Sequence, residues 1–129
     1  MKDVSGGELQ KSIGFEVVEV SEKSVSIQLK IDDRHLRPGG IMNGGISLLL
    51  IETAGSFSAY NLIDKEKQNT YGIQVSANHL AVALPGDVLI AKSEAVHIGK
   101  TTHVWDVNIT NQNGKKVSSG RITLLVASK

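Results

Sequence analysis

A single carboxylate, Glu52, stands in the only long apolar segment of the chain, GGISLLLIETAGSFSAY, which covers residues 44–60. A charge among apolar side chains is costly to bury unless it is paired or used in chemistry. This placement predicts that Glu52 is a chemical centre or has a buried cationic partner. The alternative is that Glu52 faces outward at a sheet edge and is solvated.

Two glycines, Gly44 and Gly45, open the same segment directly after Asn43, a favoured N-cap residue. A helix N-terminus presents unpaired backbone N–H groups and the positive end of the helix dipole. Glycines let a ligand approach that backbone closely, so the helix start could hold a carbonyl oxygen and the oxyanion that forms from it. The alternative is that the two glycines only allow close packing against a neighbouring element.

The spacing of these two features predicts a homodimer. Glu52 follows Gly44 by eight positions, which is roughly 12 Å along a helix that rises ~1.5 Å per residue. Glu52 therefore cannot easily reach a substrate at the start of its own helix, where attack requires about 3 Å. Two helices paired antiparallel across a two-fold axis would bring Glu52 of one subunit to Gly44 of the other, giving two shared sites. Ser56, one turn beyond Glu52, could hydrogen-bond a substrate or water, or could be structural.

The rest of the chain predicts an α+β domain in which one antiparallel sheet of six strands curls round the central helix. Period-two alternation predicts a hairpin over residues 13–31. Further strands are expected at 71–83, 88–98, 103–110 and 116–127, the last two joined at Asn113 and Gly114. The central helix is apolar on nearly all sides, which predicts burial on nearly all sides. Residues 1–10 are predicted to form a short helix or a loose arm.

Composition restricts the class of protein. The 129 residues are expected to form one domain over 1–129, and a net charge of +1 predicts neither a nucleic-acid nor a membrane partner. No cysteine is present, which excludes disulfides, a thiol nucleophile and thiolate metal sites. The N-terminus has no apolar region of a secretory signal, and the apolar run at 46–51 is too short to span a bilayer. A soluble, cytoplasmic protein is therefore expected.

The four histidines, His35, His79, His97 and His103, show no metal-ligand spacing such as HExxH, so no metal site is expected. No GxSxG motif supports Ser/His/Asp catalysis. Most of these histidines are expected to be solvated residues of turns and strand ends. The turn at 97–102 could bind a phosphate through backbone N–H groups, Lys100 and two hydroxyls, or could simply be a polar hairpin turn.

Several motifs occur in a characteristic order: PGGIMNGG, SLLLIETAGSFSAY, ANHL, PGD, HIGKTTHVW and GRITLLV, across residues 10–127. In this order the chain resembles the hotdog-fold acyl-CoA thioesterases, above all the phenylacetate-type and the 4-hydroxybenzoyl- or 1,4-dihydroxy-2-naphthoyl-CoA-type group. The resemblance implies a hotdog fold and hydrolysis of an acyl-CoA, with no cofactor beyond the coenzyme A of the substrate. It also implies sites shared across a homodimer, usually within a tetramer built from two dimers.

The resemblance implies roles for individual residues. Gly44 matches the backbone N–H that polarises the thioester carbonyl, and Glu52 matches the catalytic carboxylate. Asn43 and Ser56 complete the implied catalytic set. The residues implied to contact the substrate are Arg37, Gly45, Gly72, His79, Leu80, Ala81, Val82, His97, Ile98, Gly99, Lys100, Thr101 and Thr102.

Two positions depart from the family pattern. The motif histidine is Asn43 here, which keeps the cap and a hydrogen-bond donor but cannot carry a proton near pH 7. A loop residue that is often Gln is Arg37, which brings a fixed charge near the thioester end of the pocket. These departures leave a second hypothesis, a protein that binds or senses acyl-CoA without hydrolysing it. A dehydratase fits less well, because the central helix lacks the required histidine, and a hotdog scaffold without a ligand is the remaining alternative.

Overall fold

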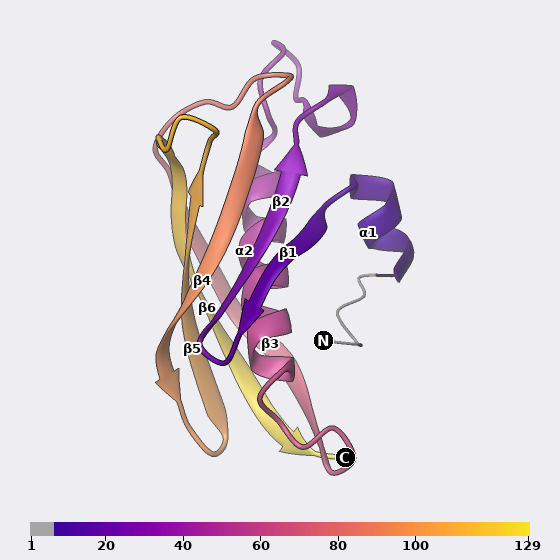
Figure 1. Ribbon diagram of the computed structural model, residues 1–129, viewed down its shortest axis with the longest axis vertical. Coiled ribbons are helices and arrows are strands. Elements are labelled where there is room, and N and C mark those ends of the chain that lie inside the picture. Colours follow the sequence, from indigo (N-terminus) through magenta and orange to yellow (C-terminus); the bar gives the residue numbers. More distant parts are fainter. Residues whose placement is uncertain (1–6) are drawn as a thin grey trace.

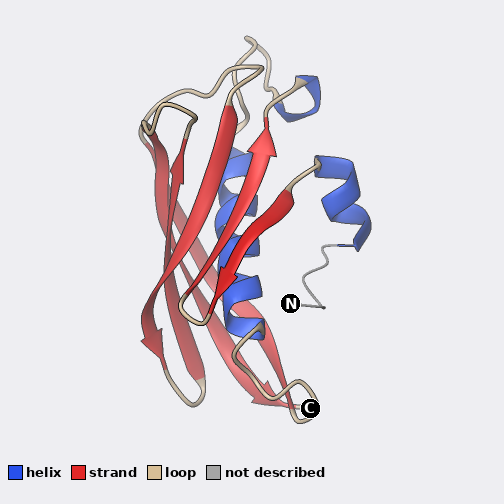
Figure 2. Ribbon diagram, in the orientation of Figure 1, coloured by secondary structure: helices blue, strands red, loops and turns tan. Residues whose placement is uncertain are grey.

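One long helix lies in the hollow of a six-stranded antiparallel sheet, as the sequence predicts (Figures 1 and 2). The computed structural model describes residues 7–129. The strand order is β1-β2-β4-β5-β6-β3, so that β1 and β3 are the two edges. In chain order the elements are α1 (Gly7–Ile13), β1 (Glu16–Ser21), β2 (Ser24–Lys30), a 3-10 helix (Asp33–His35), α2 (Gly44–Tyr60), β3 (Gln68–His79), β4 (Val88–Ile98), β5 (Thr102–Thr110) and β6 (Lys116–Ser128).

The predicted strands agree with the observed ones apart from shifts of up to three residues at their bounds and a larger difference at the end of β3. The expected strand continued to Ala83, but β3 ends at His79 because its partner strand β6 begins at Lys116. Beyond that point the Met42 N–H donates to the Ala83 carbonyl at 2.9 Å, so the segment turns toward the loop that precedes α2. Of the predicted N-terminal helix or arm, residues 7–10 belong to α1 and residues 1–6 lie outside the described residues.

The start and the packing of α2 follow from three residues. Asn43 is the N-cap, as predicted, and its Oδ1 accepts the Gly45 N–H at 2.7 Å. In the second half of the helix, a Cβ built on Gly55 would lie 2.2 Å from Cγ2 of Ile122 on β6. Gly55 therefore lets the helix backbone approach the sheet directly. The side of the helix that packs on the sheet consists of Ser47, Leu50, Ile51, Ala54, Gly55, Ser58 and Ala59.

The prediction that α2 is buried on nearly all sides is wrong for the single chain. Glu52 is exposed, whereas Ile51 and Ala54 are completely buried. The physical reason is that a single sheet covers one side of a helix and leaves the opposite side to solvent or to another molecule. The helix is apolar all round, but the chain itself buries only part of it.

The expectation that most histidines are solvated is also wrong, because two of the four are buried. His35 is 1% exposed: its Nδ1 accepts the Asp32 N–H at 3.0 Å, and its Nε2 lies 2.7 Å from the Ile13 carbonyl oxygen. Through these two hydrogen bonds the imidazole links the end of α1 to the 3-10 helix. His103 is buried beneath α2 with its ring 6.3 Å from that of Trp105, and its Nδ1 has no hydrogen-bond partner among residues 7–129.

The buried His103 is expected to make stability depend on pH. Burial lowers the pKa of His103 below its usual value of 6.5, and the nearby charge of His97 lowers it further. As the pH falls below 6.5, the unfolded chain takes up a proton that the folded chain does not, so the free energy of unfolding decreases. One such proton contributes at most ~1.4 kcal/mol per pH unit. Urea unfolding between about pH 5.5 and 7.5 measures this slope, which His103→Phe should reduce.

The exposed His97 supplies the control for this experiment. His97→Gln should keep most of the pH dependence, since burial is the larger cause of the pKa shift of His103. Equal slopes for the wild type and His103→Phe would show that His103 is not the responsible group.

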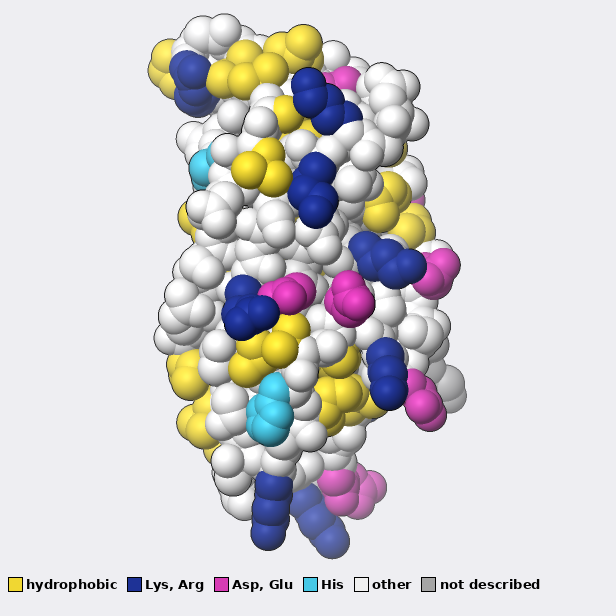
Figure 3. Space-filling model, turned by 90° about the vertical axis from the view of Figure 1, so that its left-hand side faces the viewer, with side chains coloured by type: hydrophobic (Ala, Val, Ile, Leu, Met, Phe, Trp, Pro, Cys, Tyr) yellow, Lys and Arg dark blue, Asp and Glu magenta, His cyan; other side chains and the backbone are white. Residues whose placement is uncertain are grey.

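The outer face of β4, β5 and β6 carries acidic, basic and hydrophobic side chains interspersed with one another (Figure 3). Arg121 and Asp106 form an ion pair, with Nε 2.6 Å from Oδ1. No helix among residues 7–129 is long and apolar enough to cross a membrane.

Candidate active site

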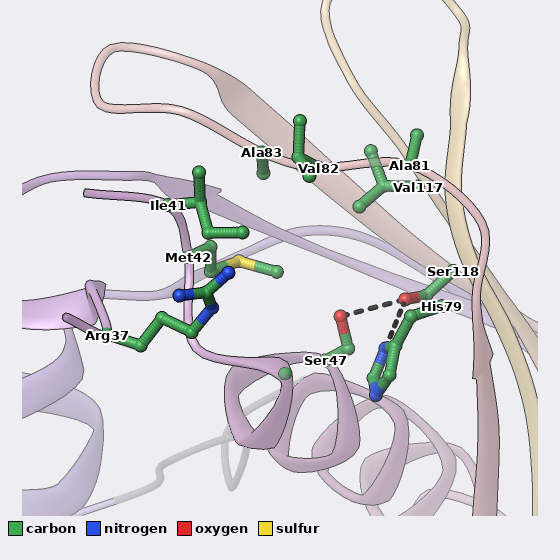
Figure 4. Close-up of a pocket in the computed structure, with 11 residues that line it drawn as sticks. Arg37, Ile41, Met42, Ser47, His79, Ala81, Val82, Ala83, Val117 and Ser118 are labelled. Carbon is green, nitrogen blue, oxygen red and sulfur yellow. Dashed lines mark hydrogen bonds between the residues drawn. The ribbon is translucent and has the colours of Figure 1, made fainter. Parts of the chain in front are cut away.

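A cavity of about 190 Å³ opens at the N-terminal end of α2 (Figure 4). Its walls come from the loop before α2, the first turn of α2, the segment that follows β3 and the start of β6. The lining residues are Arg37, Ile41, Met42, Gly44, Ser47, His79, Ala81, Val82, Ala83, Val117 and Ser118.

At the helix start the cavity contains a backbone donor that the fold leaves unused. Asn43 caps the helix by accepting the Gly45 N–H, and its carbonyl oxygen accepts the Ile46 N–H at 3.0 Å. The Gly44 N–H, in contrast, has no hydrogen-bond partner among the described residues. Gly44 also lines the cavity, which Gly45 does not. A carbonyl oxygen at this helix start would therefore find the Gly44 N–H and the positive end of the helix dipole.

A chain of three side chains holds His79 against the helix start. The His79 Nδ1 lies 3.2 Å from the Ser118 Oγ, which donates to the Ser47 Oγ at 2.9 Å (Figure 4). Because Ser118 donates to Ser47, its oxygen is free to accept the Nδ1–H of His79, so Nε2 of the neutral ring carries the lone pair. A Cβ built on Gly44 would lie 2.9 Å from that Nε2. An ionisable group thus lies beside the free Gly44 N–H, although Asn43 cannot titrate.

Ser47 and Ser118 are site residues that the sequence pattern did not predict. The sequence does contain an indication of Ser47, since a hydroxyl interrupts the apolar run three positions after Gly44. It contains none of Ser118, which meets His79 only because the register of β3 and β6 pairs these two residues. Both serines are completely buried, so their hydrogen bonds fix the imidazole from beneath.

Glu52 lies outside this cavity. Its Oε2 would be 2.8 Å from a Cβ on Gly72, so the carboxylate rests against β3 where that strand has no side chain. Gly44 packs against His79, which lies seven positions further along β3. That separation corresponds to about 20 Å of strand. Within one chain, Glu52 and the half-buried Ser56 one turn later are therefore remote from the Gly44 N–H.

The turn between β4 and β5 is at the other end of the sheet, on the side where α2 ends (Figure 1). The Gly99 N–H donates to the Thr102 carbonyl at 2.9 Å, and a Cβ on Gly99 would lie 2.5 Å from Nε2 of His97. Only a glycine at position 99 therefore leaves room for the imidazole of His97 over the turn. Lys100 is exposed at its tip.

The residues singled out from the sequence thus form two separate groups. Around the cavity lie Arg37, Asn43, Gly44, Gly45, His79, Leu80, Ala81 and Val82, although Asn43, Gly45 and Leu80 do not line it. Away from the cavity lie Glu52, Ser56, Gly72, His97, Ile98, Gly99, Lys100, Thr101 and Thr102. One chain brings together the members of the first group only.

Similarity to known proteins shows the family. A model of the thioesterase superfamily matches residues 39–118, more than half of the chain. The chain belongs to the thioesterase superfamily. A 1,4-dihydroxy-2-naphthoyl-CoA hydrolase of Listeria monocytogenes is 36% identical over 121 residues, which cover 94% of this chain and 97% of that enzyme.

Solved thioesterases share the whole fold. A mutant of thioesterase PA1618 from Pseudomonas aeruginosa matches with a TM-score of 0.89 at 30% identity, covering 94% of this chain and 86% of that one. A hypothetical thioesterase of Streptococcus pneumoniae, solved with coenzyme A, matches with a TM-score of 0.81 at 30% identity over 89% of this chain and 90% of that one. The hotdog fold and the thioester hydrolase activity that the motifs implied are thereby confirmed.

Proposed function

We propose that this thioesterase hydrolyses an acyl-CoA at two equivalent sites, each built from both subunits of a homodimer. The observation that carries the proposal is the separation, within one chain, of the free Gly44 N–H from the Glu52 carboxylate. The relative solved with coenzyme A and the CoA hydrolase among the similar sequences support a CoA thioester as substrate.

In the proposed site the cavity receives the acyl group. The thioester carbonyl oxygen accepts the Gly44 N–H at the start of α2, where the helix dipole stabilises the negative charge that develops on that oxygen. Asn43 holds the first turn of the helix in place and so positions this donor. Arg37 and Asn43 orient the acyl group.

Glu52 of the partner subunit supplies the second half of the chemistry. Either its carboxylate attacks the carbonyl carbon and expels the CoA thiolate, leaving a mixed anhydride that water then hydrolyses, or it removes a proton from a water that attacks the same carbon. Both routes consume one water and yield a free acid and CoA. Ser56 of the partner subunit, one helical turn away, is placed to hydrogen-bond the water or the substrate.

The free edge of the sheet offers a means of dimerisation. β3 is an edge strand of 12 residues, and its Tyr71 and Ile73 side chains are 52% and 59% exposed. Edge strands of this length are usually covered in native proteins. Antiparallel pairing of β3 with its copy around residues 75 and 76 would lay the Gly72 end of one strand beside the His79 end of the other. Glu52 of one subunit would then approach Gly44 of its partner.

The same two-fold arrangement accounts for the turn at 97–102. This turn lies at the end of the sheet remote from the cavity of its own chain. In the dimer this turn and Glu52 would both lie close to the partner's cavity. Lys100 would there bind a phosphate of CoA near the surface. Since the family resemblance implies a tetramer, we expect two such dimers to assemble into one.

Release of free thiol from acyl-CoA tests the proposal directly. The purified protein is incubated with a panel of aryl- and fatty-acyl-CoAs and a thiol-trapping reagent, and light scattering gives the number of subunits in solution. We expect turnover of at least one thioester by a dimer or a tetramer. Micromolar binding of acyl-CoA without thiol release would instead indicate a sensing protein, and a catalytically active monomer would contradict the shared site.

A further inference from the structure

The cavity contains one charged side chain whose hydrogen-bonding capacity the fold leaves largely unused. Arg34 and Arg121 are each paired with an aspartate, whereas Arg37 forms no ion pair within residues 7–129. The one hydrogen bond of its guanidinium to the described chain runs from Nη1 to the carbonyl of the adjacent Pro38. A guanidinium has five N–H donors in a planar fork, so most of them remain available to a ligand.

A tight turn holds the backbone of Arg37 at the edge of the cavity, and the exposed guanidinium forms part of the cavity wall. The Arg37 N–H donates to the Ile41 carbonyl at 2.9 Å, and the Gly40 N–H donates to the Arg37 carbonyl at 3.1 Å. Gly39 has a φ of 102°, in the region that favours glycine, and a Cβ there would lie 3.0 Å from Nη1 of Arg37. The turn therefore depends on glycine both for its backbone conformation and for space beside the guanidinium. Figure 4 shows Arg37 on the loop side of the cavity, opposite His79 and Ser47.

The other walls give a ligand little to bind except apolar surface. Ile41, Met42, Val82 and Val117 present hydrocarbon and a thioether, and the buried Ser47 and Ser118 hydroxyls already bond to each other. Arg37 brings the largest set of free donors to the cavity. The other groups available to a ligand are the Gly44 N–H, the imidazole of His79 and the backbone N–H groups of Ile41, Val82 and Ala83, which have no partner among residues 7–129. A substrate that uses both the Gly44 N–H and the Arg37 fork must carry a second acceptor at some distance from its thioester carbonyl.

We propose that the preferred acyl group ends in a carboxylate that binds Arg37, which makes the substrate a short ω-carboxyacyl-CoA. This inference rests on the proposed function and specifies its substrate class. The thioester carbonyl lies at Gly44 and the methylenes follow the apolar walls. The guanidinium, across the cavity from His79, then binds the distal carboxylate through two parallel N–H bonds, and not the thioester end of the substrate as the family resemblance implies. A cavity of about 150 Å³ holds benzene, so the 190 Å³ here is large enough for an acyl group of the size of glutaryl.

The test compares two thioesters of nearly the same shape. Glutaryl-CoA ends in a carboxylate, and 5-methylhexanoyl-CoA replaces that carboxylate with an uncharged isopropyl group. We expect the wild type to have the higher kcat/KM for glutaryl-CoA. In Arg37→Gln the ratio of the two kcat/KM values should fall by about 10- to 150-fold, the range for loss of charged hydrogen bonds. Arg37→Lys, which keeps the charge without the fork, should lie between the two.

The ratio of the two kcat/KM values depends only on the acyl end of the substrate, because both thioesters carry the same CoA. If Arg37 bound a phosphate of CoA instead, Arg37→Gln would weaken both substrates equally and the ratio would stay unchanged, which would overturn the inference. Arg121→Gln, on the outer face of the sheet, removes one positive charge elsewhere and should leave the ratio unaltered. A wild-type preference for the uncharged thioester would also overturn the inference.

Failure of the proposed function can be distinguished from failure of this inference. Hydrolysis of either thioester supports the proposed function whatever the ratio. Hydrolysis of another thioester of the panel but of neither member of this pair would overturn the inference alone. If the wild type hydrolyses no thioester at all, the proposed function fails, and calorimetry then measures the Kd of the same pair. Tighter binding of glutaryl-CoA that Arg37→Gln abolishes would still support the carboxylate site, and equal affinities would exclude it.

Discussion

Glu52→Gln is expected to abolish thioester hydrolysis while leaving the protein folded. A positioned acid or base contributes about 10²- to 10⁴-fold to rate, so we expect kcat to fall at least ~10²-fold if the carboxylate attacks the substrate or deprotonates water. Glu52 is exposed in the single chain, so its loss should change the free energy of unfolding by less than ~0.5 kcal/mol. Thiol release under saturating acyl-CoA, together with urea unfolding, measures both quantities.

Glu94→Gln provides the matched control. Glu94 is an exposed carboxylate of β4, and its neighbour across the ladder is Asp106. The same chemical change at this position should leave kcat unaltered. A Glu52→Gln enzyme that turns over at the wild-type rate would remove Glu52 from the mechanism.

Mixing two inactive variants is expected to restore activity, because each proposed site takes Gly44 from one chain and Glu52 from the other. Gly44→Pro removes the N–H donor at the first helical position, where proline is tolerated, and Asn43 before it already has the extended backbone that proline requires. The added Cβ would lie 2.9 Å from Nε2 of His79, so this imidazole must shift as well. Alone, the Gly44→Pro variant should lose about 10²- to 10³-fold in kcat. A heterodimer of Gly44→Pro with Glu52→Gln retains one intact site and one doubly defective site.

The number of intact sites in each dimer sets how much activity the mixed variants regain. Random refolding of an equal mixture gives about half heterodimers, so total activity should reach roughly one quarter of the wild type. Heterodimers isolated with two different affinity tags should reach about one half. Mixtures of differently tagged Glu52→Gln chains should stay inactive. If the mixed variants show no more activity than their separate sum, each site lies within one chain and the shared-site mechanism is wrong.

Local sequence patterns were sufficient to predict much of the architecture. Period-two alternation, an asparagine at a helix start and the Asn113 and Gly114 turn each act between residues close in sequence, so the strands, the cap and the hairpin were predictable. The helical spacing of Gly44 and Glu52 is likewise local, and it sufficed to separate them along one helix.

Contacts between distant segments decided the rest. Whether a face of α2 is covered depends on the reach of the sheet, and that leaves Glu52 exposed over Gly72 rather than buried. The pairing of β3 with β6 sets Ser118 beneath His79, and packing of β3 on α2 sets that imidazole beside Gly44. Strand register and helix orientation result from the packing of the whole core, so no local pattern specifies them.

The amino-acid order therefore determined that a glycine-started helix with a central carboxylate would lie within an antiparallel sheet, because propensity and periodicity act over a few residues. Tertiary structure determined which groups share a cavity: Gly44, His79 and Arg37 are together, and Glu52 is apart. The reason is that burial and register join residues far apart in the chain, and these associations exist only once the sheet has closed around the helix.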